Sequence, residues 1–190
     1  MSGEWLLIRG SGVVAFALLT AATTWGLLVS TKMLGRLAKP KTLTWFHESL
    51  GIGALLATLV HVGVLSVHDF LDFSWLELLV PGVSDWRPMA VAMGIGAFYG
   101  LALVSTSFYL KKWIGQKTWR AIHFGSIGVF VASLLHGMWA GTDTNEPMMI
   151  GLYVGSAAIV FTLIGFRLFG DIATRARPPR PDAREVGAPR

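Results

Sequence analysis

The sequence contains no cysteine and little charge. The absence of cysteine excludes a disulfide framework, a thiolate zinc site and an iron–sulfur cluster held by cysteines. Only 14% of the 190 residues are charged and 53% are hydrophobic, whereas an average soluble domain has about 25% charged residues. The sixteen lysines and arginines lie in loops and at the ends of the chain, so the net charge of +5 does not indicate a nucleic-acid partner. The composition indicates one domain folded in lipid.

Long apolar runs occupy most of the chain. An α-helix needs about 20 mainly apolar residues to cross a bilayer core of about 30 Å. Five stretches meet this condition and predict an all-α integral membrane protein, a bundle of five transmembrane helices. The predicted spans are residues 12–30, 44–67, 88–110, 118–140 and 148–169.

The charges between the spans predict the orientation. The connections between the first and second spans and between the third and fourth spans are basic, as is the C-terminal end. The connections between the second and third spans and between the fourth and fifth spans are acidic. The basic segments hold Lys32, Arg36, Lys39, Lys41, Lys111, Lys112, Lys117, Arg120 and the arginines from Arg167 onward; the acidic ones hold Asp69, Asp72, Glu77, Asp85, Asp143 and Glu146. Because basic loops stay in the cytoplasm, we expect the N-terminus outside and the C-terminus inside, in a plasma membrane, most simply a bacterial one. Six of the eight tryptophans fall near predicted interfaces, which is typical of membrane proteins.

The last twenty residues differ from the rest. Residues 171–190 are rich in proline and arginine and have almost nothing to bury. They predict a disordered cytoplasmic tail behind a membrane domain of residues 10–170.

Four histidines lie inside the predicted spans. His47 and His61 are 14 residues apart in the second span, and His123 and His136 are 13 apart in the fourth. Each spacing is about 20 Å along a helix axis. The two spans run in the same direction, so His47 lies at the level of His123, and His61 at the level of His136. Ionisable side chains are costly in lipid and usually functional there.

Paired imidazoles on facing helices are the ligands of a bis-histidyl haem. Small residues near the histidines would make room for a macrocycle. These are Gly51, Ala54, Thr58, Gly125, Ser126, Gly128 and Gly137. Thirteen residues do not return to the same helix face, so either the two haems are laterally offset or Gly125 and Gly128 distort the fourth helix. A haem-free transporter or proton channel that uses the same histidines is the alternative function.

Four other residues are weaker candidates. Arg120 and Arg87 are each placed to pair with a haem propionate or to serve as ordinary charged anchors. Glu48 is a candidate proton relay or a solvated carboxylate in the first helical turn. His68, beside Asp69, is a solvated loop residue or a quinone or metal contact.

Three segments carry a resemblance to a known family. They are WFHESLG with His61 fourteen residues after His47, TWRAIH with His136 thirteen after His123, and the run STSFYLKKWIGQKTWRAIH. The pattern resembles the ferric reductase-like transmembrane domain, which is shared by ferric reductases, NADPH oxidases and the haem subunit of the bacterial periplasmic methionine sulfoxide reductase system. The resemblance covers about residues 10–170. It implies two b-type haems that relay electrons across the membrane, as one component of an oxidoreductase.

The chain departs from the oxidases and reductases of that family at its C-terminal end. About twenty residues follow the last span, too few for a flavin and nicotinamide domain. We therefore expect no flavin or NAD(P) site on this chain. The expected donor is a cytoplasmic flavoprotein or a membrane quinol, and the expected acceptor is an external ferric chelate, oxygen, quinone or redox protein.

Overall fold

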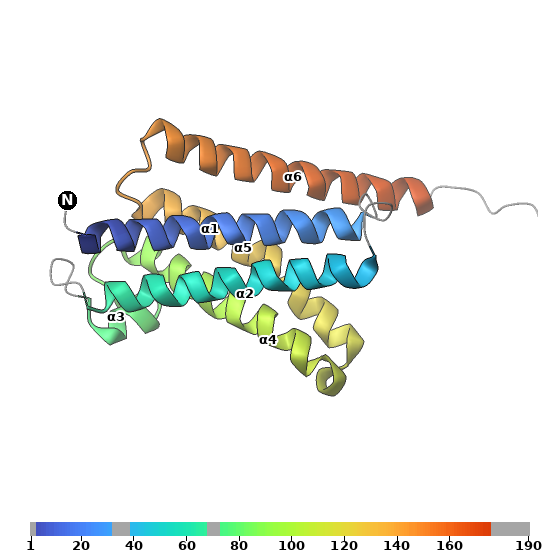
Figure 1. Cartoon of the computed structure of the whole chain (residues 1–190), viewed down its shortest axis with the longest axis horizontal. Coiled ribbons are helices and arrows are strands. Elements are labelled where there is room, and N and C mark those ends of the chain that lie inside the picture. Colours follow the sequence, from blue (N-terminus) through green and yellow to red (C-terminus); the bar gives the residue numbers. More distant parts are fainter. Residues whose placement is uncertain (1–2, 32–38, 68–72, 176–190) are drawn as a thin grey trace, which may run out of the picture.

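A computed structural model describes residues 3–31, 39–67 and 73–175, and the described part contains helices but no strand. Five long helices and one short helix follow one another (Figure 1). They are α1 (Gly3–Ser30), α2 (Pro40–Leu65), α3 (Trp75–Leu79), α4 (Pro88–Phe124), α5 (Ser126–Ala140) and α6 (Pro147–Arg175). The prediction of an all-α protein is confirmed for these residues.

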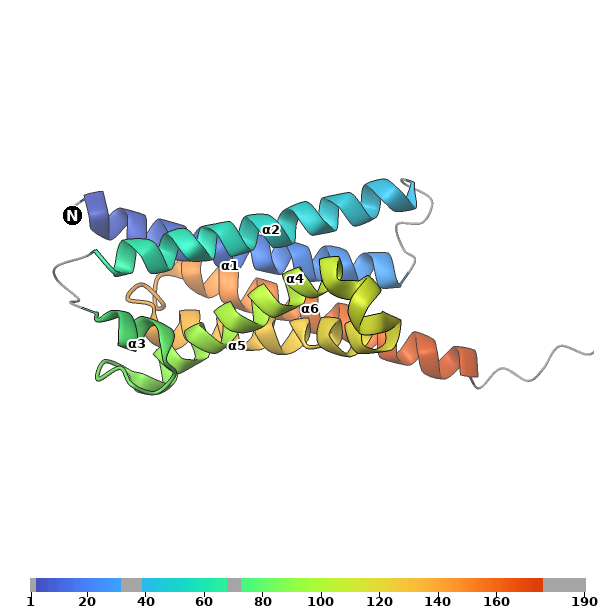
Figure 2. The ribbon, with the colours of Figure 1, turned by 90° about the horizontal axis from the view of Figure 1, so that it is seen from below.

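Helix α4 contains a reversal of the chain. Gly115 has non-helical angles of φ 81° and ψ 159°, a left-handed φ that glycine adopts without steric cost. The chain turns back at this point, so residues 116–124 and α5 run antiparallel to the first part of α4 (Figure 2). We call residues 116–140 the returning arm. It corresponds to the predicted span 118–140.

Four of the described helical stretches are long and apolar enough to cross a membrane. They are Trp5–Ser30, Pro40–Leu65, Pro88–Ala140 and Pro147–Phe169. The third is 53 residues long and includes the reversal at Gly115. The length and apolar composition of these helices make this a multi-pass membrane protein.

Proline and capping residues determine where several helices begin. Pro40 starts α2 four residues before the predicted span, because its fixed φ suits the first helical position. Glu48 therefore lies in the third turn of α2, and its predicted place in a first turn is wrong. The short helix α3, which no long apolar run predicts, begins with a capping box of Ser74 and Glu77. Hydrogen bonds from Ser74 hold the pKa of the exposed Glu77 carboxyl below its usual value.

Helix α6 extends further than predicted. It continues to Arg175, so the first five residues of the predicted tail are helical. No glycine or proline interrupts residues 171–175, and the first proline of the tail is Pro178. The rest of the predicted tail, residues 176–190, lies outside the described residues.

The bundle consists of two antiparallel hairpins with α6 packed beside them (Figures 1 and 2). Helices α1 and α2 form the first hairpin, and α4 with the returning arm forms the second. Trp25 Nε1 donates to the carbonyl oxygen of Leu43 (3.0 Å) and joins α1 to α2. Arg167 donates to Ser30 Oγ (3.1 Å) and joins α6 to α1. One end of the bundle, here called the α3 end, carries α3 and the start of α1; the other, the Gly115 end, carries the reversal.

Candidate functional site

The four histidines meet as two pairs inside the bundle. The ring centroids of His47 and His123 are 5.9 Å apart, and those of His61 and His136 are 6.5 Å apart. The ring planes of each pair are close to perpendicular, at 77° and 78°. The predicted pairing by level is therefore confirmed as a spatial arrangement.

A break at Gly125 lies between the two histidines of the returning arm, which both pair with histidines of α2. Gly125 lies between α4 and α5, and its N–H donates to the Ile122 carbonyl three residues back (2.9 Å). This tighter turn changes the rotation along the arm between His123 and His136. The predicted distortion at Gly125 is confirmed. Gly128 lies within the continuous helix α5.

Each histidine of the α3 end is held by a backbone carbonyl of the neighbouring helix. His61 Nδ1 lies 3.0 Å from the Ile8 oxygen of α1, and His136 Nδ1 lies 2.8 Å from the Ala90 oxygen of α4. A carbonyl accepts only, so Nδ1 carries the proton in both rings. The lone pair of Nε2 is then free for a metal, which is the usual arrangement of ligating histidines.

A glycine lies four residues after each of these carbonyls and packs against the same ring. A Cβ on Gly12 would lie 3.1 Å from His61 Cε1, and a Cβ on Gly94 would lie 2.6 Å from His136 Cε1. Because glycine has no side chain, the ring can lie against the helix and reach the carbonyl one turn away. Each of these two histidines is thus held by a carbonyl and a glycine four residues apart on one neighbouring helix. This arrangement occurs once in each hairpin, on α1 and on α4.

The same arrangement recurs at the Gly115 end in a looser form. A Cβ on Gly26 would lie 2.9 Å from His47 Cε1. The Ala22 carbonyl, four residues earlier, also faces this ring. It lies outside regular hydrogen-bond geometry, so His47 Nδ1 is buried without a hydrogen bond among the described residues. The fourth histidine, His123, has no facing glycine among the described residues. The first part of α4 runs antiparallel to the returning arm, so the position that corresponds to Gly94 lies 13 residues further along, at Ser107, which is 1% exposed.

An apolar layer separates the two pairs. It is formed by Leu19, Ala54, Ala97, Leu101 and Val129. Leu19 lies midway between Gly12 and Gly26 in sequence, and Ala54 lies midway between His47 and His61. Ala54 therefore closes the space between the levels; it does not widen either site. Gly51, also expected to make room, has nothing within 4 Å of its virtual Cβ.

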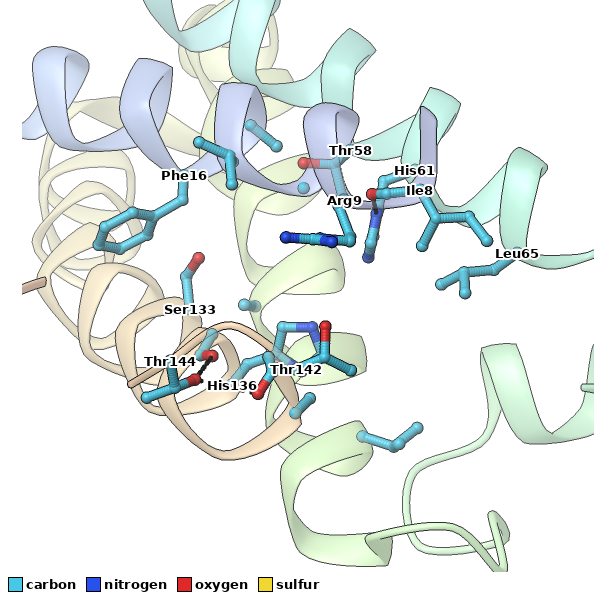
Figure 3. A pocket seen from close by; sticks show the side chains of 18 of the residues that line it. Ile8, Arg9, Phe16, Thr58, His61, Leu65, Ser133, His136, Thr142 and Thr144 are labelled. Carbon is cyan, nitrogen blue, oxygen red and sulfur yellow. Dashed lines mark hydrogen bonds between the residues drawn. The ribbon is translucent and has the colours of Figure 1, made fainter. Parts of the chain in front are cut away.

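A cavity of about 250 Å³ opens beside the His61–His136 pair. Figure 3 shows the two rings entering it from opposite sides, His61 from α2 and His136 from α5. Its walls are mainly apolar and include Phe16, Leu101 and Met149. Gly137, predicted to make room for a macrocycle, lines this cavity, and the Tyr153 ring packs against it.

The ring separations fit a single metal ion between the two rings of each pair. A histidine nitrogen lies about 2 Å from a bound metal and about 1 Å from its own ring centre, which gives about 6 Å between the centres. The observed 5.9 and 6.5 Å agree with this value. No group of three or more His, Cys, Asp or Glu side chains suited to a metal ion occurs among the described residues. A haem iron needs only two protein ligands, because the macrocycle supplies the other four.

Aromatic and basic side chains extend the site at the Gly115 end. The Trp119 ring stacks on the His123 ring, with centroids 5.2 Å apart and planes at 25°. The Lys111 ammonium lies 4.2 Å from the centroid of Trp119. Trp119 is one of the six tryptophans that the sequence predicts near a membrane interface, and the structure places its ring against a candidate ligand.

The weaker candidates fall in different places. Arg87 donates to the Trp139 carbonyl oxygen and lies over the Trp86 ring. It is not among the residues that line the cavity. Glu48 accepts a hydrogen bond from the Tyr109 hydroxyl of α4. Arg120 is exposed. His68 lies outside the described residues.

Sequence reasoning missed the facing glycines and one arginine. Gly12 and Gly26 are 14 residues apart, the same spacing as His47 and His61. This equality was a detectable signal, because two antiparallel helices bring equally spaced positions together. Arg9, not Arg87, is the arginine that lines the cavity. Its position depends on the packing of α1 against α2 and has no local signal in the sequence.

Comparisons with known protein families, curated proteins and solved structures found no match for this chain.

Proposed function

We propose that this protein is a di-haem membrane cytochrome b that carries electrons across the bilayer. The observation that carries the proposal is the pair of two-histidine sites, each with rings about 6 Å apart and separated by one apolar layer. A single buried histidine is well explained as a hydrogen-bonded core residue. Four histidines in two facing pairs, three of them lying against facing glycines, are not.

The residues of the chain have defined roles in this proposal. His47 and His123 would hold one haem iron, and His61 and His136 the other. The Ile8 and Ala90 carbonyls keep Nε2 of His61 and His136 unprotonated and pointed away from the helix. The haems, when bound, would supply one-electron chemistry. The protein contributes the ligands, their orientation and an apolar surrounding.

The five-span topology belongs to the same proposal. The reversal at Gly115 would divide the 53-residue stretch into two crossings, with the N-terminus and the α3 end outside. The basic connections would then face the cytoplasm, as the positive-inside rule requires. A cytoplasmic flavoprotein or a quinol would supply electrons to the His47–His123 haem. An external ferric chelate, oxygen, quinone or redox protein would take them from the His61–His136 haem. These roles follow the resemblance to the ferric reductase-like domain.

Haem content tests the function. We expect the purified full chain to contain two haems b, with a b-type band in the reduced-minus-oxidised spectrum. NADH and NADPH should not reduce these haems without an added flavoprotein, because hydride carries two electrons and each haem accepts one. A folded, haem-free protein would contradict the proposal and favour the transporter or proton channel.

Reporter fusions test the orientation. Fusions after Lys39 and Lys117 should report the cytoplasm, and fusions after Ser84 and Thr144 the outside. The opposite pattern would place the His61–His136 pair on the cytoplasmic side.

A further inference from the structure

An ion pair lies at the cavity beside His61 and His136. Arg9 of α1 pairs with Asp143 in the connection between α5 and α6. Their side chains are 32% and 26% exposed, and both residues line the cavity. Among the described residues that line it, Arg9 is the only lysine or arginine and Asp143 the only acid. Figure 3 shows the Arg9 side chain beside the space between the two histidine rings.

The backbone that carries Arg9 also holds the His61 ring. The Ile8 carbonyl, one residue before Arg9, accepts the His61 hydrogen bond (3.0 Å). Gly12, three residues after Arg9, packs against the same ring. One turn of α1 therefore orients a candidate ligand and presents a cation at the same cavity.

The chain segment around Asp143 is attached to the end of α5. The Thr144 hydroxyl lies 3.0 Å from the Met138 carbonyl oxygen and 3.0 Å from that of Gly141. These contacts attach the connection to the end of α5, the helix that carries His136. The ion pair thus joins the backbone around one candidate ligand to the backbone around the other.

The ion pair adds little to the stability of the fold, but its arginine is suited to bind an anion. A partly exposed pair adds little net stability, because solvation of the separate charges offsets most of their attraction. A haem b, in contrast, brings two carboxylates to the rim of its site, and arginine binds a carboxylate through two parallel hydrogen bonds. With Asp143 left in place, three carboxylates would share one cation.

We infer that Arg9 binds a carboxylate of the haem between His61 and His136, and that this carboxylate displaces Asp143. The inference rests on the proposed function. Arg9 is in this account a positioning residue, which sets the haem's orientation and the charge beside it. Asp143 holds the guanidinium in place until the haem carboxylate takes over.

The two partners are expected to shift the reduction potential of this haem in opposite directions. Reduction adds one negative charge, which a nearby cation favours and a nearby carboxylate opposes. Arg9→Gln should therefore lower the reduction potential of the His61–His136 haem by about 59 mV. This shift corresponds to a change of about tenfold in the equilibrium constant for its one-electron reduction. Asp143→Asn should raise the potential by a smaller amount, because a displaced carboxylate lies further away.

The test is a potentiometric titration of the full-length protein, with haem content and the visible spectrum recorded for each variant. The step belonging to this haem is the one that disappears in His61→Ala. Arg87→Gln is the matched control, since Arg87 lies at the same end but is not among the cavity-lining residues. Arg9→Lys keeps the positive charge, so the reduction potential of this haem should stay close to the wild-type value.

Each outcome separates the inference from the function on which it rests. If Arg9→Gln loses this haem while Arg9→Lys and Arg87→Gln keep it, the inference is supported. Unchanged potentials and haem content in Arg9→Gln would overturn it and leave the di-haem function intact. Shifts of the same sign in Arg9→Gln and Asp143→Asn, or an equal loss in Arg87→Gln, would also overturn it. A wild-type protein without haem would refute the proposed function itself.

Discussion

The two histidine pairs have similar ring spacings but different surroundings. At the α3 end, both rings are hydrogen-bonded through Nδ1, and a cavity with one ion pair lies beside them. At the Gly115 end, His47 Nδ1 has no regular hydrogen bond among the described residues, and His123 stacks on Trp119. The first pair is positioned mainly by backbone carbonyls, and the second mainly by contact with an aromatic ring and a glycine.

This difference bears on how rigidly each pair is held. A hydrogen bond to a helical carbonyl fixes both the tautomer and the rotation of an imidazole. A stacked ring restricts tilt but leaves the tautomer free. We therefore expect the His61–His136 pair to be the more sharply positioned of the two.

The largest expected effect comes from removing a ligand. His61→Ala or His136→Ala should lose the haem of the α3 end, and His47→Ala or His123→Ala the haem of the Gly115 end. Each variant should keep one haem per chain, because the apolar layer separates the sites. Haem assays on the purified variants check this. Full haem content in any of the four would exclude that histidine as a ligand, and His68 would be the next candidate.

Replacing the three facing glycines by alanine should reduce haem affinity, and more strongly the closer the new methyl group lies to the histidine ring. The virtual Cβ lies 2.6 Å from His136 for Gly94, 2.9 Å from His47 for Gly26 and 3.1 Å from His61 for Gly12. We expect haem affinity to fall most in Gly94→Ala, by about tenfold or more, since overpacking costs about 1–3 kcal/mol. Gly26→Ala and Gly12→Ala should follow in that order.

Gly96→Ala is the matched control for this series. Gly96 lies two residues from Gly94 on the same helix and has nothing within 4 Å of its virtual Cβ. Alanine is a better helix former than glycine by about 0.5–1 kcal/mol, so this variant should keep both haems and unfold no more easily. Equal losses in Gly94→Ala and Gly96→Ala would show that the facing glycine does not position the ring.

The smallest effect is expected from the Lys111–Trp119–His123 stack. Lys111→Gln removes a cation from the face of the partly buried indole, and a cation–π contact is worth about 0.5–2 kcal/mol depending on its exposure. The potential of the His47–His123 haem should fall by a few tens of millivolts, and that of the other haem should stay constant. Lys112→Gln is the control, since Lys112 lies over Trp113 instead. An equal shift in both haems would mean that the stack has no specific role.

Part of this arrangement was predictable from the sequence because it depends on local pattern. Apolar length predicts the long helices, and the 14- and 13-residue spacings predict two levels of paired histidines. The contacts of those rings were not predictable. Whether Gly12 meets His61, or Arg9 reaches the cavity, depends on the register between α1 and α2 and not on either helix alone. Helix α3 was missed because its capping box, and not an apolar run, defines it.

The most direct test of the account is electron paramagnetic resonance of the oxidised full-length protein. Six-coordinate iron with two histidine ligands is low spin, and nearly perpendicular imidazole planes make its signal strongly anisotropic, because two iron d orbitals become almost equal in energy. The planes of the two pairs meet at 77° and 78°. We predict two low-spin signals of this type, one lost in His61→Ala and the other in His47→Ala. A protein that gives only high-spin haem, or no haem signal, would contradict the account.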